Sequence, residues 1–174
     1  PGGRLVASSG MRNPKYGLQD QRDLIQVDFD GHIEWQWNQA EFITDPGEEP
    51  QWMARQHHDF QREGNPVGYY VPGMEPRIDG GNTLVLAHKD EHVPFISDKL
   101  LLDDVVYEVN WEGDIIWEWH CSEHVEEMGF SEEARNAMCR NPNYRGGSLV
   151  EDSPAIGDWM HINSMSVLGP NRWY

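Results

Sequence analysis

The sequence predicts an all-β fold made of repeated four-stranded antiparallel units, the pattern of a β-propeller. The main observation is an internal repeat: residues 23–37, DLIQVDFDGHIEWQW, recur 82 positions later as residues 105–119, VVYEVNWEGDIIWEW. Composition agrees, because eight tryptophans and 17 glycines supply the large flat side chains and the turns that strands use. A strand pattern repeated at this spacing is typical of propeller blades.

Each copy of the repeat is predicted to form a β-hairpin. Apolar and polar residues alternate on both sides of the pairs Asp30-Gly31 and Glu112-Gly113. This is the pattern of two antiparallel strands joined by a tight turn. Both copies end in the motif W-x-W, whose tryptophans are expected to pack between blades.

Two further strands complete the repeated unit. Residues 80–87, GGNTLVLA, resemble residues 2–7, GGRLVA, as a glycine turn that runs into a short apolar strand. Residues 57–61, HHDFQ, lie upstream of that strand, and residues 160–164, MHINS, follow the second hairpin. A unit therefore has a first strand that carries a histidine, a second apolar strand, and the hairpin. Four antiparallel strands per unit indicate a propeller blade.

Residues 1–174 are predicted to be a single partial propeller domain with about two blades' worth of strands spread over three blades. The blade strands are expected at about 3–38, 57–119 and 159–168, and long loops at 39–56, 62–79 and 120–158. Such loops either line a site or decorate the rim. Because propellers close with about four to eight blades, the rest of the propeller is expected from more polypeptide, either a second chain or a continuation.

Charge and hydropathy exclude some classes of partner. The formal net charge of −17 argues against binding of nucleic acid or of anionic membranes through the general surface. No run of 18 apolar residues is present, so no membrane span is expected. The sequence starts at Pro1 without a visible signal peptide. A processed or excised start would explain both facts, so this says nothing about secretion.

The two cysteines leave two alternatives open. Cys121 and Cys139 flank residues 126–135, which have helical character and a plausible N-cap at Ser131. The cysteines either form a disulfide that closes this excursion or remain two reduced, buried thiols. Their number alone does not decide the redox compartment.

The candidate site residues are His58, His161 and Asn163. The two histidines fall at the same place on successive first strands, which face the central channel of a propeller, so they are expected to share one pocket. Asn163 lies two residues after His161, hence on the same face of a strand. Histidine moves protons near neutral pH, and Asn donates hydrogen bonds to an anion. The alternative is that each histidine only caps a strand in the channel wall.

Other polar residues near these strands are expected to be structural. His57 directly precedes His58, so strand alternation should point it the other way, whereas Asp59 is a candidate to brace a histidine. His120 and His124 have the spacing of metal ligands on a helix, but no C-x-x-C or H-E-x-x-H motif accompanies them. No metal or cofactor is therefore expected.

Together these motifs resemble a known family. The W-x-W hairpins, H-H-D at 57–59, G-N-T-L-V-L at 81–86 and H-x-N-S at 161–164, in this order, are similar to the arylsulfotransferase family. The resemblance implies a six-bladed propeller whose central channel transfers a sulfuryl group from a phenolic sulfate ester to a phenol without a nucleotide cofactor. His58, His161 and Asn163 match channel residues of that sulfate site.

The resemblance carries further expectations. Family members transfer the sulfuryl group through a transiently sulfated histidine, and an arginine helps to hold the sulfate. Both lie downstream of the H-x-N motif, and neither is assigned within this sequence. A secreted or periplasmic location and a small aromatic substrate are also implied. The competing hypotheses are a lyase or hydrolase that uses the channel histidines, and a binding or scaffold propeller without catalysis.

Overall fold

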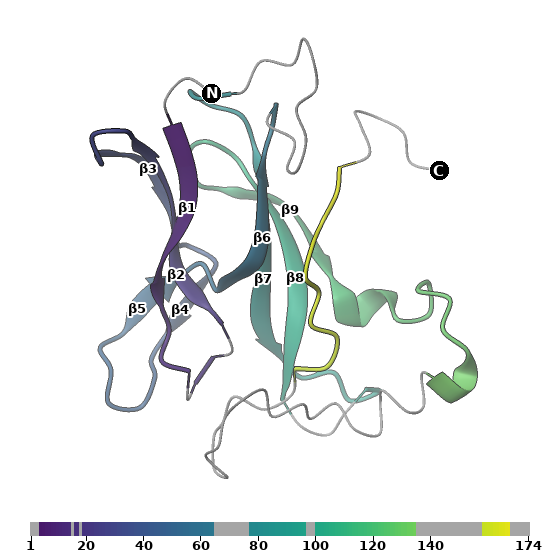
Figure 1. Cartoon of the computed structure of the whole chain (residues 1–174). Coiled ribbons are helices and arrows are strands. Elements are labelled where there is room, and N and C mark those ends of the chain that lie inside the picture. Colours follow the sequence, from purple (N-terminus) through teal and green to yellow (C-terminus); the bar gives the residue numbers. More distant parts are fainter. Residues whose placement is uncertain are drawn as a thin grey trace.

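The structure is a computed structural model that describes residues 4–14, 16–17, 19–64, 77–96, 100–134 and 158–167 (Figure 1). The described part of the chain is all-β with almost no helix, as predicted. Its elements are β1 (Arg4–Met11), β2 (Gln21–Asp28), β3 (Ile33–Trp37), β4 (Glu41–Ile43), β5 (Gln51–Met53), β6 (Gln56–Arg62), β7 (Thr83–Glu91), β8 (Leu101–Val109), β9 (Ile115–His120) and the 3₁₀ helix η1 (Cys121–His124). Among these residues, no helix is long and apolar enough to cross a membrane.

Seven strands form one antiparallel sheet that divides into two units joined by a short seam, and β4 and β5 form a separate two-stranded sheet. β6, β7, β8 and β9 pair in chain order, which is the four-stranded unit expected from the sequence. β1, β2 and β3 form a three-stranded unit. The units join where Gln21 of β2 pairs with Gln56 of β6, and Figure 1 shows them diverging away from this point.

The internal repeat is reproduced in hydrogen-bond register. Val27 pairs with Ile33 in the first hairpin, and the repeat-equivalent Val109 pairs with Ile115 in the second. Each hairpin contains a register shift at the same place, next to Val27 and next to Val109. The alternation of apolar and polar residues therefore predicted both the strands and their pairing.

The two hairpin turns also share their chemistry. The side-chain oxygen of Asp28 accepts a hydrogen bond from the backbone of His32, and that of Asn110 accepts one from Asp114, at 2.9 and 2.8 Å. Gly31 and Gly113 have φ values of 85° and 98°, a left-handed conformation that glycine adopts without a steric penalty. The Asp-Gly and Glu-Gly signals in the sequence mark these turns.

The first W-x-W motif packs the first unit against the second. The ring of Trp35 stacks on Trp111 with centroids 6.0 Å apart, and its Nε1 donates to the Trp111 carbonyl at 2.9 Å. Trp37 Nε1 donates to the carbonyl of Gly113 at 3.1 Å. The guanidinium of Arg62 lies over both rings, 4.5 Å from Trp35 and 4.9 Å from Trp111. This contact fulfils the expectation that these tryptophans pack between units.

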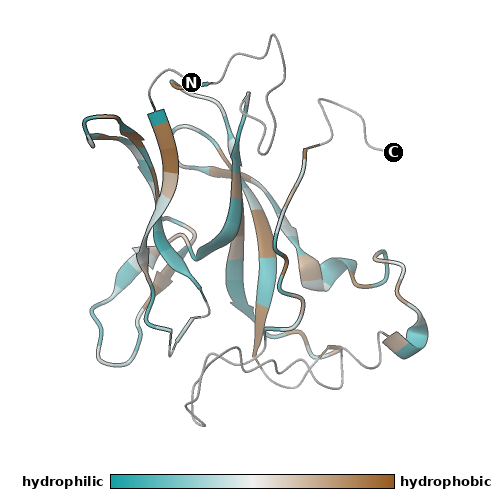
Figure 2. Ribbon diagram, in the orientation of Figure 1, coloured by the Kyte–Doolittle hydropathy of each residue, from teal (hydrophilic) through white to brown (hydrophobic). Residues whose placement is uncertain are grey.

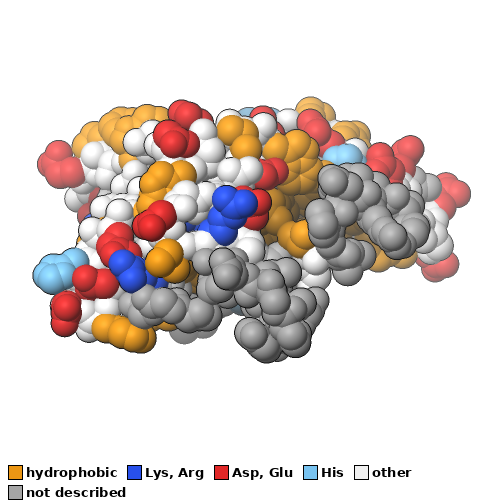
Figure 3. All heavy atoms as spheres, turned by 90° about the horizontal axis from the view of Figure 1, so that it is seen from above, with side chains coloured by type: hydrophobic (Ala, Val, Ile, Leu, Met, Phe, Trp, Pro, Cys, Tyr) orange, Lys and Arg blue, Asp and Glu red, His pale blue; other side chains and the backbone are white. Residues whose placement is uncertain are grey.

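The hydrophobic core lies where the two units meet. Its buried members come from both units, and Figure 2 shows hydrophobic and hydrophilic stretches side by side along their strands. They are Leu24, Trp35, Trp37, Ala54, Val85, Ala87, Val105, Tyr107 and Val109. Acidic and hydrophobic side chains dominate the face seen from above, and basic ones are few (Figure 3), in keeping with the net charge.

Two expectations about local structure are corrected. The segment 39–56, expected as a loop, contains the β4–β5 hairpin, because Phe42 and Trp52 pack edge to face at 5.4 Å across it. Residues 159–168 were expected to form a strand. Their described part, 159–167, contains no strand, and the nearest pairing is an isolated parallel bridge between Leu102 and Asp158, just before it. Two backbone N–H groups of this segment, those of Ile162 and Met165, donate hydrogen bonds to the carboxylates of Asp104 and Asp59 instead.

The excursion after β9 is described in part. Ser131 Oγ accepts a hydrogen bond from the backbone of Ala134 at 3.2 Å, as expected of an N-cap. Cys121 is a free, buried thiol, and burial raises its pKa. Cys139, its partner in the disulfide alternative, lies outside the described residues, as do most of 120–158 and residues 65–76 of the loop 62–79.

Candidate functional site

Two of the sequence-predicted site residues meet in the structure. His58 Nε2 and His161 Nε2 lie 3.0 Å apart, although the residues are 103 positions apart in the chain. Their rings pack edge to face with centroids 4.9 Å apart. At this distance the two nitrogens can form a hydrogen bond when one ring carries N–H at Nε2 and the other has a lone pair there. The shared location expected for the two histidines is therefore found.

Both histidines have the same unusual backbone. His58 has φ 51° and His161 has φ 54°, in the left-handed region that L-residues seldom occupy. Only two other non-glycine residues of the described chain, Gln19 and Arg55, share this conformation. Strain of this kind costs on the order of 1–3 kcal/mol and tends to occur at functional sites. The same backbone conformation at two repeat-equivalent histidines indicates that the repeat positions both rings in the same way.

His57 does not point away from the site, contrary to expectation. Its ring is buried, stacks on His88 with centroids 3.7 Å apart, and lies 5.4 Å from the ring of His58. The left-handed backbone at His58 and the register shift between Gln56 and Phe60 interrupt the alternation on which the expectation relied. Burial lowers the pKa of His57 to about 4 against the opposing effect of Asp104, so the ring is neutral near pH 7.

His88 is a site residue that the sequence reasoning missed. It directly follows the GGNTLVLA segment on β7, and its Nδ1 donates to Asp20 Oδ1 at 2.7 Å. Asp20 is fully buried and also pairs with Arg55 at 2.8 Å and Arg12 at 3.1 Å. Burial acts to raise the pKa of Asp20, but Arg55 and His88 outweigh it and hold that pKa far below its usual range. The carboxylate thus fixes the ring of His88.

A carboxylate also orients His161. The ring Nδ1 of His161 donates to Asp158 Oδ2 at 2.7 Å. Burial raises the pKa of Asp158, and His161 opposes that rise. With Nδ1 engaged, Nε2 is the ring atom that faces His58. Burial, followed by the nearby charge of His161, lowers the pKa of His58, so a proton on His58 is easily given up.

Side-chain carboxylates dock residues 158–167 beside β6 and β8. Ile162 N donates to Asp104 Oδ2 at 3.0 Å, and Met165 N donates to Asp59 Oδ2 at 2.8 Å. Asp59 therefore holds the backbone of this segment rather than bracing a histidine. Asn163, the third predicted site residue, lies in the same segment and is exposed.

The metal-ligand spacing of His120 and His124 is not realised. His120 Nδ1 lies 2.9 Å from Glu91, whereas His124 pairs with Glu127 and stacks on Trp119. The side chains near His120 that could bind a metal together with it are Glu91 and Asp103, and His124 is not among them.

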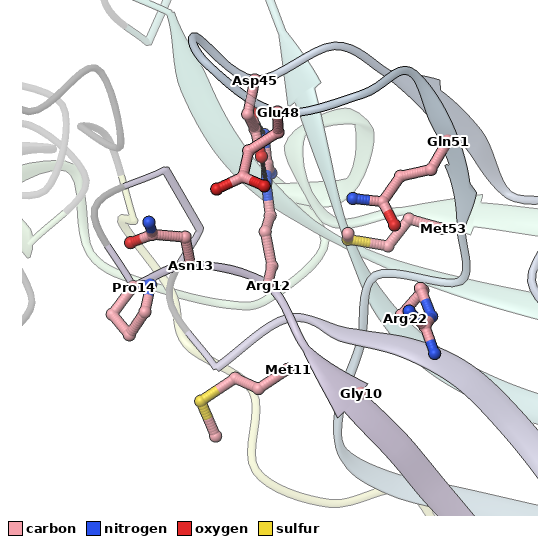
Figure 4. A pocket seen from close by; sticks show the side chains of 10 residues that line it. All are labelled: Gly10, Met11, Arg12, Asn13, Pro14, Arg22, Asp45, Glu48, Gln51 and Met53. Carbon is pink, nitrogen blue, oxygen red and sulfur yellow. Dashed lines mark hydrogen bonds and ion pairs between the residues drawn. The ribbon is translucent and has the colours of Figure 1, made fainter.

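An open polar pocket lies between the end of β1 and the β4–β5 hairpin. It has a volume of about 560 Å³ and is lined by Gly10, Met11, Arg12, Asn13, Pro14, Arg22, Asp45, Glu48, Gln51 and Met53. Figure 4 shows Arg12 reaching Asp45, to which it donates two hydrogen bonds of 2.9 and 2.7 Å. No histidine lines this pocket, so it is separate from the histidine site.

Comparison with known proteins supports one family. A family model described as Arylsulfotransferase (ASST) matches residues 76–172, more than half of the chain. The matched range includes His88 and His161, whereas His57 and His58 precede it. No curated protein and no solved structure matches the chain significantly.

Proposed function

The chain belongs to the arylsulfotransferase family, and we propose that it forms part of a site that moves a sulfuryl group from a phenolic sulfate ester to a phenol. The observation that carries the proposal is the His58–His161 pair, with its 3.0 Å contact and matching left-handed backbones. Two histidines with facing ring nitrogens form a site for an anionic group.

The proposed role of the pair is to stabilise charge. In sulfuryl transfer a nucleophile forms a bond to sulfur while the bond from sulfur to the aryl oxygen breaks, and the phenol leaves with a proton. Negative charge builds on the sulfuryl oxygens and on the departing oxygen. The ring N–H groups of His58 and His161, with the amide of Asn163, would donate hydrogen bonds to these oxygens. The acceptor phenol then takes the sulfuryl group from the nucleophile and releases its own proton.

Asp158 is proposed as a positioning residue for this chemistry. Its hydrogen bond to Nδ1 keeps the second nitrogen of His161 directed at His58. A carboxylate behind a histidine fixes the tautomer and stabilises the protonated ring. Replacement by Asn would leave the side-chain volume in place and remove that charge.

We further propose that the two units are blades of a propeller of about six blades that more polypeptide completes. The support is the four-stranded unit, its in-register repeat, and the packing of one hairpin's tryptophans on the next hairpin's turn. A secreted or periplasmic location and a small aromatic substrate are proposed from family membership alone.

The reaction is tested with the full-length protein, an aryl sulfate donor and a phenol acceptor, by following release of the donor phenol by absorbance. His58→Ala and His161→Ala are each expected to lower the rate roughly 100- to 1000-fold, as for loss of one oxyanion donor. His92→Ala, an exposed histidine outside the cluster, is the control and should keep full activity.

Two results would overturn the proposal in different ways. Full activity in both site variants would remove these histidines from the mechanism. No transfer by wild-type protein over a broad panel of donors would instead favour a lyase, a hydrolase or a binding propeller.

A further inference from the structure

A buried cluster of metal-ligand side chains lies next to the His58–His161 pair. His57, His88 and Asp104 come from β6, β7 and β8, and each offers one ligand atom within 4.8 Å of the others. His57 Nε2 lies 3.0 Å from Asp104 Oδ1, and His88 Nε2 lies 3.7 Å from the same oxygen. A second triad, His88 with Asp158 and His161, shares His88.

The cluster contains buried polar atoms that make no well-aligned hydrogen bond to any described residue, although His57 Nε2 and Asp104 Oδ1 are close enough to attract each other. They are both ring nitrogens of His57, Nε2 of His88 and Oδ1 of Asp104, although these three side chains are at most 1% exposed. A buried polar group without a partner is destabilising, so such groups are uncommon in folded proteins. Several such nitrogen and oxygen atoms lie together around one carboxylate oxygen. Their lone pairs could all be bound by a cation placed between them.

The charges around the cluster also favour a cation. Asp20 is neutralised by two buried arginines, Arg12 and Arg55. Asp104 and Asp158, in contrast, have ion pairs only with histidines among the described residues. Two buried carboxylates without a lysine or arginine partner leave an excess of negative charge, which a divalent cation would balance.

His88 has the orientation of a metal ligand. Its Nδ1 is held by Asp20 at 2.7 Å, which leaves Nε2 directed at Asp104. A carboxylate that binds the far nitrogen of a metal-ligating histidine is a common arrangement, because it fixes the tautomer and makes the ligand more basic. Asp20, itself fixed by Arg12 and Arg55, is thus an outer partner to the cluster.

We propose that His57, His88 and Asp104 bind a divalent first-row transition-metal ion. Imidazole and carboxylate suit Zn²⁺ and its neighbours, and bonds of about 2.0–2.1 Å place neighbouring ligand atoms roughly 3.3 Å apart. The observed 3.0 and 3.7 Å lie on either side of that value. Since a lone pair lies in the ring plane, His57 must turn out of its stack on His88 when the ion binds.

This metal site is not part of the proposed sulfuryl transfer, and metal binding can be measured whether or not the protein has that activity. Purified full-length protein is treated with a chelator and titrated with Zn²⁺ by calorimetry and with Co²⁺ by visible absorption. One high-affinity equivalent is expected, with a Co²⁺ spectrum typical of nitrogen and oxygen ligands. Zn²⁺ should also raise the melting temperature, because it binds only the folded state.

Matched variants locate the ion. Asp104→Asn and His88→Gln should each weaken Zn²⁺ binding by at least about 10- to 100-fold, and His92→Gln, an exposed histidine outside the cluster, should not. Asp104→Asn keeps the side-chain volume, and intrinsic tryptophan fluorescence would show that it folds. Wild-type protein that binds neither ion, or Asp104→Asn and His88→Gln that bind both ions as tightly as wild type, would overturn the proposal.

Discussion

Trp35 and Trp117 occupy equivalent positions in the two repeats, yet Trp35 is 7% exposed and Trp117 is 43% exposed. The difference lies in what covers them. Trp35 stacks on Trp111 and donates its indole N–H to the turn of the second hairpin. Trp117 has no comparable cover from the described residues. One repeat therefore provides the packing surface for the other.

This asymmetry predicts unequal costs of substitution. In the isolated 174-residue chain, Trp35→Ala should lower the free energy of unfolding by about 3–5 kcal/mol, and Trp117→Ala by less than about 1 kcal/mol. Urea titration followed by circular dichroism measures both, with Trp117→Ala as the matched control. Equal costs would contradict the prediction for the isolated chain and would mean that another surface covers Trp117.

The assembly is predicted to extend beyond one copy of this chain. Among the described residues, Trp117 has an exposed face, and β1 and β9 lie at edges of the sheet and pair with a strand on one side only. Light scattering on purified protein should give a mass above 20.1 kDa, from a second chain, from a longer polypeptide or from self-association. A single species with the mass of one chain over a wide range of protein concentrations would disprove this.

Arg62 should be replaceable by an apolar residue. Its side chain is 3% exposed, and its three guanidinium nitrogens have no hydrogen-bond partner among the residues that the structure describes. Burial lowers its pKa to about 10, and the rings of Trp35 and Trp111 stabilise the cation only in part. Arg62→Met keeps the packing and avoids desolvation of a charge, so we expect stability to change by less than about 1 kcal/mol or to rise. Arg62→Ala is the comparison, and it should lose about 2 kcal/mol or more through the cavity.

Asp23 should make stability depend on pH in the acid range. Its carboxylate accepts hydrogen bonds from Arg22, Gln36 and Asn38 at 2.7, 2.8 and 2.9 Å. Burial acts to raise its pKa, but these bonds outweigh it and hold the pKa below the usual value. The unfolded chain therefore binds the proton first, and the stabilisation is complete above about pH 4 and is lost as the pH falls below it.

The variant Asp23→Asn isolates this effect. At pH 7 it should unfold about 1–3 kcal/mol more easily than wild type, because three donors lose a charged acceptor. The difference should shrink as the pH falls below about 4, where the wild-type carboxylate is also neutral. Urea titrations at pH 7 and pH 3 give the comparison, and a difference that is the same at both would exclude an electrostatic origin.

The sequence predicted the repeated features of the fold well. Alternation around Gly31 and Gly113 gave both hairpins, and their register follows because a shift by one residue would move Trp35 or Trp37 to the solvent face. The β4–β5 hairpin was missed, because its strands have three residues each and lie within a turn-rich acidic segment. A strand of three residues is too short to show a recognisable alternation of apolar and polar residues.

The site was predicted in part. The recurrence of a histidine at equivalent positions of the repeat predicted that His58 and His161 lie together, and they do, although His161 is not on a strand. The left-handed backbone at His58 could not be predicted, because histidine does not signal positive φ, and the error over His57 followed from it. His88 follows a strand that was correctly recognised, but pairing it with Asp20, 68 positions away, requires tertiary structure.

The contact between His58 and His161 spans 103 positions of sequence and has a consequence for folding. Closing so long a loop carries an entropic cost that local hairpins avoid, so this contact is expected to form after β2–β3 and β8–β9. During synthesis, which proceeds from the N-terminus, His58 is exposed on the ribosome well before its partner exists. The emerging chain thus forms its sheets first, and His58 and His161 meet only when the segment after residue 158 has docked.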